Sequence, residues 1–260
     1  MSDATRARLA AMLADEPLDL AEANLLISAE AAPDLDVAAW LARVDALAGR
    51  AAADGVARAL RGAGLRGDAE DYDDPRNSFL DQVLERRRGL PIALATLTLA
   101  VARRVGAPMM GIGMPGHFVV ADVSGAEPEY LDPFAGWVPR SPDELAAIVR
   151  RTSGLEMRAE FLEPVGDRTI LARTLANLRG SYLRRRRLRD ALWATELGLL
   201  VAPGDPALES QAIGLLAGAG RYDEAEERAT AFLAAHPGRP EAAAVRERLD
   251  AARDMRRRMN

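Results

Sequence analysis

The sequence lacks cysteine and lysine, and His117 and His236 are its only histidines among 260 residues. Without cysteine the chain can form no disulfide, thiolate nucleophile, iron–sulfur cluster or cysteine-ligated zinc site. Without lysine it has neither the phosphate-binding lysine of a P-loop nor a Schiff-base nucleophile. Because two distant histidines with scattered carboxylates fall short of any ligand pattern, we expect no metal site and no cofactor.

Long apolar runs are also missing. The longest, over residues 90–101, is interrupted by Thr96 and Thr98, and it falls short of the roughly 20 residues that span a bilayer. The N-terminal residues contain no apolar stretch of the kind that directs secretion. The 34 basic residues against 39 acidic ones give a net charge of −5, which disfavours nucleic-acid binding. We therefore expect a cytoplasmic protein whose partners include neither membranes nor nucleic acids.

Residues 1–70 are predicted to be helical. Trp40, Val44 and Leu47 recur at intervals of three or four residues, which places them on one face of a helix. Asp36 precedes this run and can cap the helix, because its carboxylate can accept the free backbone N–H groups of the first turn.

The stretch from Asn77 to Gly89 predicts a short helix. Asn77 or Ser78 can cap it, apolar residues recur at helical spacing over residues 79–84, and Gly89 can end it. Arginines occupy positions 86–88, in the last turn, where positive charge suits the helix dipole. We expect these arginines to be solvated.

Pro91 suits the first position of the next helix, which runs to residue 105 and is apolar on nearly every side. An all-round apolar helix predicts a buried, central position. Short strands are expected after it, over residues 109–114, 117–123 and 129–132. His117 then begins the second strand, and Ser141 opens a capping box before a further helix.

The last third of the chain repeats at an offset of 34 residues. The residues that recur are Leu188 with Tyr222, Ala191 with Ala225, Pro203 with Pro237, Gly204 with Gly238, and Pro206 with Pro240. This period is typical of tetratricopeptide repeats, each of which is a pair of helices. A final helix over residues 241–259 would cap the two repeats.

Five segments occur in a specific order: Asn77-Ser-Phe-Leu, Gly89-Leu-Pro-Ile-Ala-Leu, Ala102-Arg-Arg-Val-Gly106, Gly116-His-Phe and Leu131-Asp-Pro-Phe134. In this order and spacing the chain resembles the bacterial SirB-type proteins, which join a transglutaminase-like domain to tetratricopeptide repeats. The resemblance implies an α+β fold with a papain-like core, in which a buried central helix packs on a small antiparallel sheet. We predict a helical segment over residues 1–70, this core over 71–166, and all-α repeats over 167–260.

Active transglutaminase-like enzymes use a cysteine at the start of the central helix, a histidine on a strand and an aspartate on the next strand. The helix N-terminus and the histidine activate the thiol, and the aspartate orients the imidazole. The resemblance assigns the histidine to His117 and the aspartate to Asp132. Counting back one helix length from Gly106 places Pro91 at the cysteine position. The acyl-transfer nucleophile is therefore missing.

Two interpretations of His117 and Asp132 remain open. They can form a surviving acid–base pair, or an inherited hydrogen-bonded pair that joins two strands of the core. Asn77 and Ser78 can likewise be a helix cap or a support for the cleft.

The arginine run Arg184, Arg185, Arg186 and Arg187 is the best electrostatic candidate for a partner surface, because residues 169–260 hold 16 arginines against 12 acidic residues. Its alternative is a solvated helix end.

Three functions are compatible with these patterns. The first is a non-catalytic scaffold that binds a protein or peptide through the repeats. The second is a hydrolase that uses His117 and Asp132 to activate water. The third is a small-molecule pocket without turnover.

Overall fold

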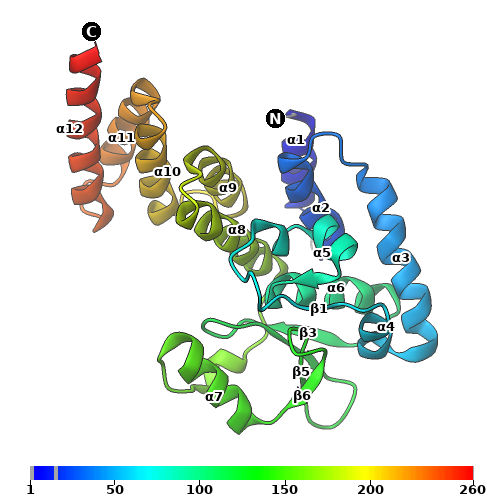
Figure 1. Cartoon of the computed structure of the whole chain (residues 1–260). Helices are drawn as coiled ribbons and strands as arrows, with labels where there is room; N and C mark the ends of the chain where they lie inside the picture. The colour runs from blue at the N-terminus through cyan, green and yellow to red at the C-terminus, as the bar shows by residue number, and fades with distance from the viewer. Residues whose placement is uncertain (1–2, 15–16, 260) are drawn as a thin grey trace. The chain divides into compact units, whose positions relative to one another are not determined.

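The computed structural model describes residues 3–14 and 17–259, and the chain divides into two compact units, Met1–Thr174 and Leu175–Asn260 (Figure 1). The first unit combines helices with a small antiparallel sheet, and the second is helical. Within the described residues, no helix combines the length and the apolarity that crossing a bilayer requires.

The first unit begins with the helices α1 (Asp3–Met12), α2 (Leu20–Ala31), α3 (Val37–Asp54) and α4 (Val56–Gly62). The expected cap of α3 is confirmed, since the Asp36 carboxylate accepts the backbone N–H of Ala39. Asp19 caps α2 in the same way, through the backbone N–H groups of Ala21 and Glu22.

The expected central helix is α6 (Pro91–Arg104), with Pro91 at its first position. Every residue from Pro91 to Ala102 is buried. The helices α2, α3 and α4 pack against α6, as do the strands β3 and β4. The N-terminal helices and the core consequently share one hydrophobic cluster. The division into residues 1–70, 71–166 and 167–260 stays a prediction.

Four strands form an antiparallel sheet in the order β3 (Met109–Ile112), β4 (Val119–Asp122), β5 (Glu129–Asp132) and β6 (Val138–Arg140). Both faces of the sheet are covered. Val120 and Leu131 join the cluster of α6. Val119 and Ala121 pack with Leu145 of α7 (Pro142–Ser153), whose capping box at Ser141 is confirmed. A second, two-stranded sheet pairs β1 (Arg66–Gly67) with β2 (Arg88–Gly89) in parallel.

The helix expected after Asn77 differs from the prediction at both ends. The helix α5 is Leu80–Arg86, and its cap residue Phe79 makes no side-chain capping bond. Neither Asn77 nor Ser78 caps it, because a 3₁₀ turn, η1 (Pro75–Asn77), occupies this segment and is itself capped by Asp74. Arg87, with φ 57°, ends α5 in the left-handed conformation, and Gly89 lies in β2.

The 3₁₀ turn η2 (Ala159–Leu162) precedes the remaining helices α8 (Asp167–Arg184), α9 (Leu188–Val201), α10 (Pro206–Gly218), α11 (Tyr222–Ala235) and α12 (Glu241–Met259). Leu188 and Tyr222, which are related by the repeat offset, each begin a helix. The buried small residues Ala191 and Ala225 are equivalent positions in α9 and α11. The helices follow the expected pattern, and their assignment as tetratricopeptide repeats stays a prediction.

Candidate functional site

His117 and Asp132 lie together, with 3.1 Å between His117 Nε2 and Asp132 Oδ1. Asp132 is the last residue of β5, and His117 lies in the turn that enters the neighbouring strand β4. The expectation that His117 belongs to the strand itself is wrong, because β4 begins at Val119. The side chains of His117 and Asp132 are only 10% and 4% exposed.

The Asp132 carboxylate is held ionised by its neighbours. Its Oδ1 also accepts the backbone N–H groups of Phe134 and Ala135, and Arg140 Nε lies 3.5 Å from Oδ2. Burial alone raises the pKa of Asp132, but the hydrogen bond from His117, the N–H of Ala135 and the charges of His117 and Arg140 together hold that pKa below its usual value. An ionised carboxylate only accepts, so His117 Nε2 carries a proton and Nδ1 is left for proton transfer.

Arg173 fixes the backbone around His117. Its Nη2 donates to the carbonyl oxygens of Met114 at 2.7 Å and His117 at 3.1 Å. Its guanidinium lies 5.2 Å from the centre of the Phe118 ring, and burial lowers the pKa of Arg173. A Cβ at Gly113 would collide with this guanidinium. Sequence reasoning missed Arg173, because no motif connects it to a turn more than fifty residues earlier.

Aromatic rings cover one side of the pair. The Phe134 ring meets the His117 ring edge-on, with 6.2 Å between centroids. Tyr72, which is partly exposed, meets Phe134 edge-on at 5.8 Å. Trp137 donates its Nε1–H to Thr98 Oγ1 at 2.9 Å and is buried, so it ties the turn after Asp132 to α6.

The position that the resemblance assigns to the nucleophile holds no nucleophilic group. Pro91 starts α6 after Leu90, and neither residue supplies a hydroxyl, a thiol or a capping bond. The backbone N–H of Leu90 donates to the carbonyl of Asn77 at 2.9 Å, which brings Ser78 beside the entry to α6. The hydroxyls of Ser78 and Thr96 are buried and have no hydrogen-bond partner among the described residues. Neither hydroxyl is therefore hydrogen-bonded to His117.

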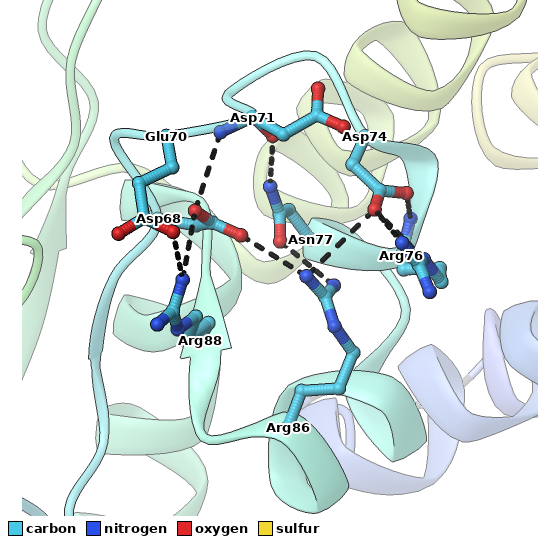
Figure 2. Close-up of polar contacts among 8 residues, drawn as sticks. All are labelled: Asp68, Glu70, Asp71, Asp74, Arg76, Asn77, Arg86 and Arg88. Atoms are coloured by element: carbon cyan, nitrogen blue, oxygen red, sulfur yellow. Dashed lines mark hydrogen bonds and ion pairs between the residues drawn. The ribbon is translucent and has the colours of Figure 1, made fainter.

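Asn77 belongs to a buried polar network (Figure 2). Its Nδ2 donates to the carbonyl of Asp71 at 2.7 Å, and its Oδ1 accepts from Arg86 Nη1 at 3.0 Å. Arg86 Nη2 donates to Asp68 Oδ2 at 3.1 Å and lies 3.8 Å from Asp74 Oδ2. Asn77, Asp68 and Asp74 are all buried. Asn77 thus supports the loop before α5, and its role as a support for the cleft stays a prediction.

The network extends to the surface at two further arginines. Arg88 pairs with Glu70 at 2.6 Å, and Arg76 pairs with Asp74 at 2.6 Å (Figure 2). Burial raises the pKa of Asp74, but the hydrogen bonds and charge of Arg76, together with the charge of Arg86, hold that pKa below its ordinary value. The expectation that residues 86–88 are a solvated helix end is wrong for Arg86. The acidic stretch before Asn77 was the available signal, since buried acids need cationic partners.

Some of the four arginines at the end of α8 already interact with neighbouring side chains. Arg187 Nε donates to Asp190 at 2.8 Å, and its guanidinium lies 4.9 Å from the centre of the Tyr182 ring. Arg184 and Arg185 also have interaction partners. Arg186 takes the left-handed conformation at φ 56°. The role of these four arginines as a partner surface stays a prediction.

No group of three or more metal-ligating side chains occurs within residues 3–14 and 17–259.

Arg86→Met should destabilise the first unit, because it leaves Asp68 and Asn77 buried without their donor. We expect a loss of about 2–3 kcal/mol in the free energy of unfolding, measured by urea denaturation. Arg88→Met is the matched control, and its loss should be smaller because its close partner Glu70 is exposed. Equal losses in the two variants would contradict a structural role for the buried half of the network.

Asp132→Asn should change how stability depends on pH. Because the folded-state pKa of Asp132 is lowered, its ionised form stabilises the fold above the unfolded pKa of about 4, and this contribution is lost as the pH falls through the folded-state value. We expect the free energy of unfolding of the variant to be about 1–2 kcal/mol lower than that of the wild type at pH 7. This difference should become smaller below pH ~4. Urea denaturation across this pH range measures it. The exposed Asp34→Asn should show no such narrowing, and a pH-independent gap for Asp132→Asn would refute the assignment.

Comparison with known proteins gives a family. The model of the transglutaminase-like superfamily matches residues 34–176, which is more than half of the chain. A UPF0162 protein of Vibrio cholerae is 39% identical over 145 residues, covering 55% of this chain and 54% of its own length. A UPF0162 protein of Xylella fastidiosa is 37% identical over 180 residues, covering 67% of this chain and 64% of its own length.

A shorter match occurs in a eukaryotic protein. F-box only protein 21 of Mus musculus is 41% identical over 70 residues, which is 27% of this chain and 11% of that protein. No solved structure matches the chain. The chain spans between about half and two thirds of the length of the UPF0162 proteins named above. The match over residues 34–176 includes α3, α6, His117 and Asp132, and it establishes that the chain belongs to the transglutaminase-like superfamily.

Proposed function

We propose that this protein is a non-catalytic member of its superfamily, in which the transglutaminase-like domain and the helices of the second unit serve as a protein-interaction scaffold. The observation that carries the proposal is Pro91 at the first position of α6. In the active enzymes that the sequence resembles, this position holds the nucleophile. Proline offers neither a nucleophilic atom nor a backbone N–H.

The surroundings of Pro91 support the same proposal. The residues of the first turn, Pro91 to Leu94, are buried and apolar, so they leave no polar group to replace a thiol. The hydroxyls of Ser78 and Thr96 are buried and make no bond to His117. A nucleophile that is not hydrogen-bonded to its base is not activated. Loss of the nucleophile typically removes most of the rate enhancement of covalent catalysis.

In this proposal His117 and Asp132 have a structural task. Their bond joins the turn before β4 to the end of β5, and Arg173 anchors the same turn through two carbonyl oxygens. A buried, ionised aspartate that accepts one side-chain and two backbone donors is well satisfied. The pair can persist for stability after the nucleophile has been lost.

The proposed partner is a protein or peptide that binds the helical pairs of the second unit. Residues 169–260 hold more arginines than acidic residues, which favours an acidic partner surface. The run Arg184, Arg185, Arg186 and Arg187 is the proposed contact region. The cytoplasmic location expected from the sequence is part of the same proposal.

A second function is favoured by one observation. Asp132 contacts His117 Nε2 at 3.1 Å, and Nδ1, which has no hydrogen-bond partner among the described residues, is available as a base. Such a base could activate water for hydrolysis. This alternative predicts turnover that depends on His117, whereas the scaffold proposal predicts none.

Turnover of a panel of esters, amides and glutamine donors distinguishes the two functions. We expect no turnover by the wild-type protein or by His117→Ala, with folding of both checked by circular dichroism. Wild-type turnover that disappears in His117→Ala would overturn the scaffold proposal in favour of hydrolysis.

Partner capture tests the scaffold directly. We expect one protein from a lysate of the source organism to be enriched equally by the wild type and by His117→Ala. The triple variant Arg184→Gln, Arg185→Gln, Arg186→Gln should reduce that enrichment about tenfold, as expected when charge-assisted contacts are lost. Quantitative mass spectrometry measures the enrichment. A partner that is lost with His117→Ala and kept by the triple variant would contradict binding through the second unit.

A further inference from the structure

A cavity of about 290 Å³ lies among α3, α4 and α5 in the first unit. Its apolar lining includes Leu47, Leu65 and Leu84. Its charged lining residues are Arg43, Arg50 and Arg87, and no acidic residue lines it. The lining residues thus combine an apolar wall with a net positive charge, which is the composition of a pocket for an organic anion.

The three arginines differ in how their charge is matched. Arg43 pairs with Glu85 at 2.7 Å and stacks over Trp40 at 4.3 Å. The side chains of Arg50 and Arg87 are exposed and form no ion pair or hydrogen bond with the residues that the structure describes. Two exposed arginines without a protein partner therefore line one cavity, and each guanidinium fork can hold two oxygens of one anion.

The backbone at Arg87 is unusual for its residue type. Arg87 ends α5 in the left-handed conformation with φ 57°, where glycine is the common residue. A non-glycine residue in this region is strained, and such strain concentrates at binding sites. Gly64, at φ 81°, lies beside it, since a Cβ there would be in ordinary van der Waals contact with Arg87 Cδ at 3.4 Å. The local structure thus tolerates strain and places this side chain at the cavity.

We propose that this cavity binds a small phosphate monoester. The phosphate would lie between Arg50 and Arg87, and a compact apolar or single-ring portion would contact Leu47, Leu65 and Leu84. A phosphate monoester carries a charge of about −1.5 to −2 at neutral pH and offers three acceptor oxygens, which match two guanidinium forks better than a monoanionic carboxylate does. The volume lies at the lower end of the range for ligand pockets, about 300–1,000 Å³, which favours a small ligand over a dinucleotide.

This inference is independent of the scaffold proposal. The pocket uses residues of α3, α4 and α5, whereas His117 and Asp132 lie at β4 and β5. The Arg86 network is also distinct from the pocket, because Arg86 faces Asn77 and Asp68 while the neighbouring Arg87 lines the cavity. The sequence Arg86-Arg87 thus serves two purposes, one inside the fold and one at its surface.

The test is calorimetric titration of the whole chain with phenyl phosphate, inorganic phosphate and phenol in low-salt buffer. We expect phenyl phosphate to bind at least about tenfold more tightly than either of the other two, because only it occupies both the cationic and the apolar part. Arg50→Gln and Arg87→Gly should each weaken binding about tenfold or more. Glycine keeps the left-handed backbone at position 87, so this variant is expected to fold.

The matched control is Arg61→Gln, which removes an exposed arginine of α4 that does not line the cavity. Arg61→Gln should bind phenyl phosphate as the wild type does. Absence of phenyl phosphate binding, equal binding of inorganic phosphate or phenol, or equal weakening in all three variants would each overturn the proposal.

Discussion

The first unit depends on the burial of α6 on all of its sides. A fourteen-residue helix whose first twelve residues are buried needs cover around its whole circumference. The N-terminal helices supply that cover on one side, and the sheet supplies it on the other. This requirement explains why the helices before residue 70 belong to the same compact unit as the sheet. The sheet carries apolar residues on both faces, because one face packs on α6 and α7 covers the other.

The buried polar groups of this apolar unit occur in small groups whose members form hydrogen bonds with one another. Thr98 accepts from Trp137 and donates to Leu94, so a hydroxyl within α6 is fully used. Asp132 collects donors from His117 and from two backbone N–H groups. Asn77, Asp68 and Arg86 form the third set. Each set joins segments that are distant in sequence, so the polar contacts determine which loops meet while apolar burial supplies most of the stabilisation.

Much of this arrangement could be predicted from the sequence where a local signal existed. The cap at Asp36, the proline at the start of α6, the capping box at Ser141 and the third strand, Glu129–Asp132, all depend on a few adjacent residues. The pairing of His117 with Asp132 followed from a family resemblance. Where the outcome depended on tertiary contacts, prediction failed. Asn77 has the side chain of a helix cap, but Asp71 and Arg86 bind its amide group. Arg86 and Arg87 are adjacent in sequence, and only the fold distinguishes the half-buried Arg86, which binds buried partners, from the exposed Arg87.

The proline at position 91 also limits which side chains a point mutation can place at the start of α6. Proline codons differ from cysteine codons at both of the first two bases, so no single base substitution restores a thiol at the start of α6. Serine is a single-base neighbour of proline and would introduce a hydroxyl there. A single base change can thus introduce a hydroxyl but no thiol at this position, and the hydroxyl would arise in a turn that is otherwise buried and apolar. A path of point mutations from proline to cysteine at this position passes through an intermediate with a different side chain.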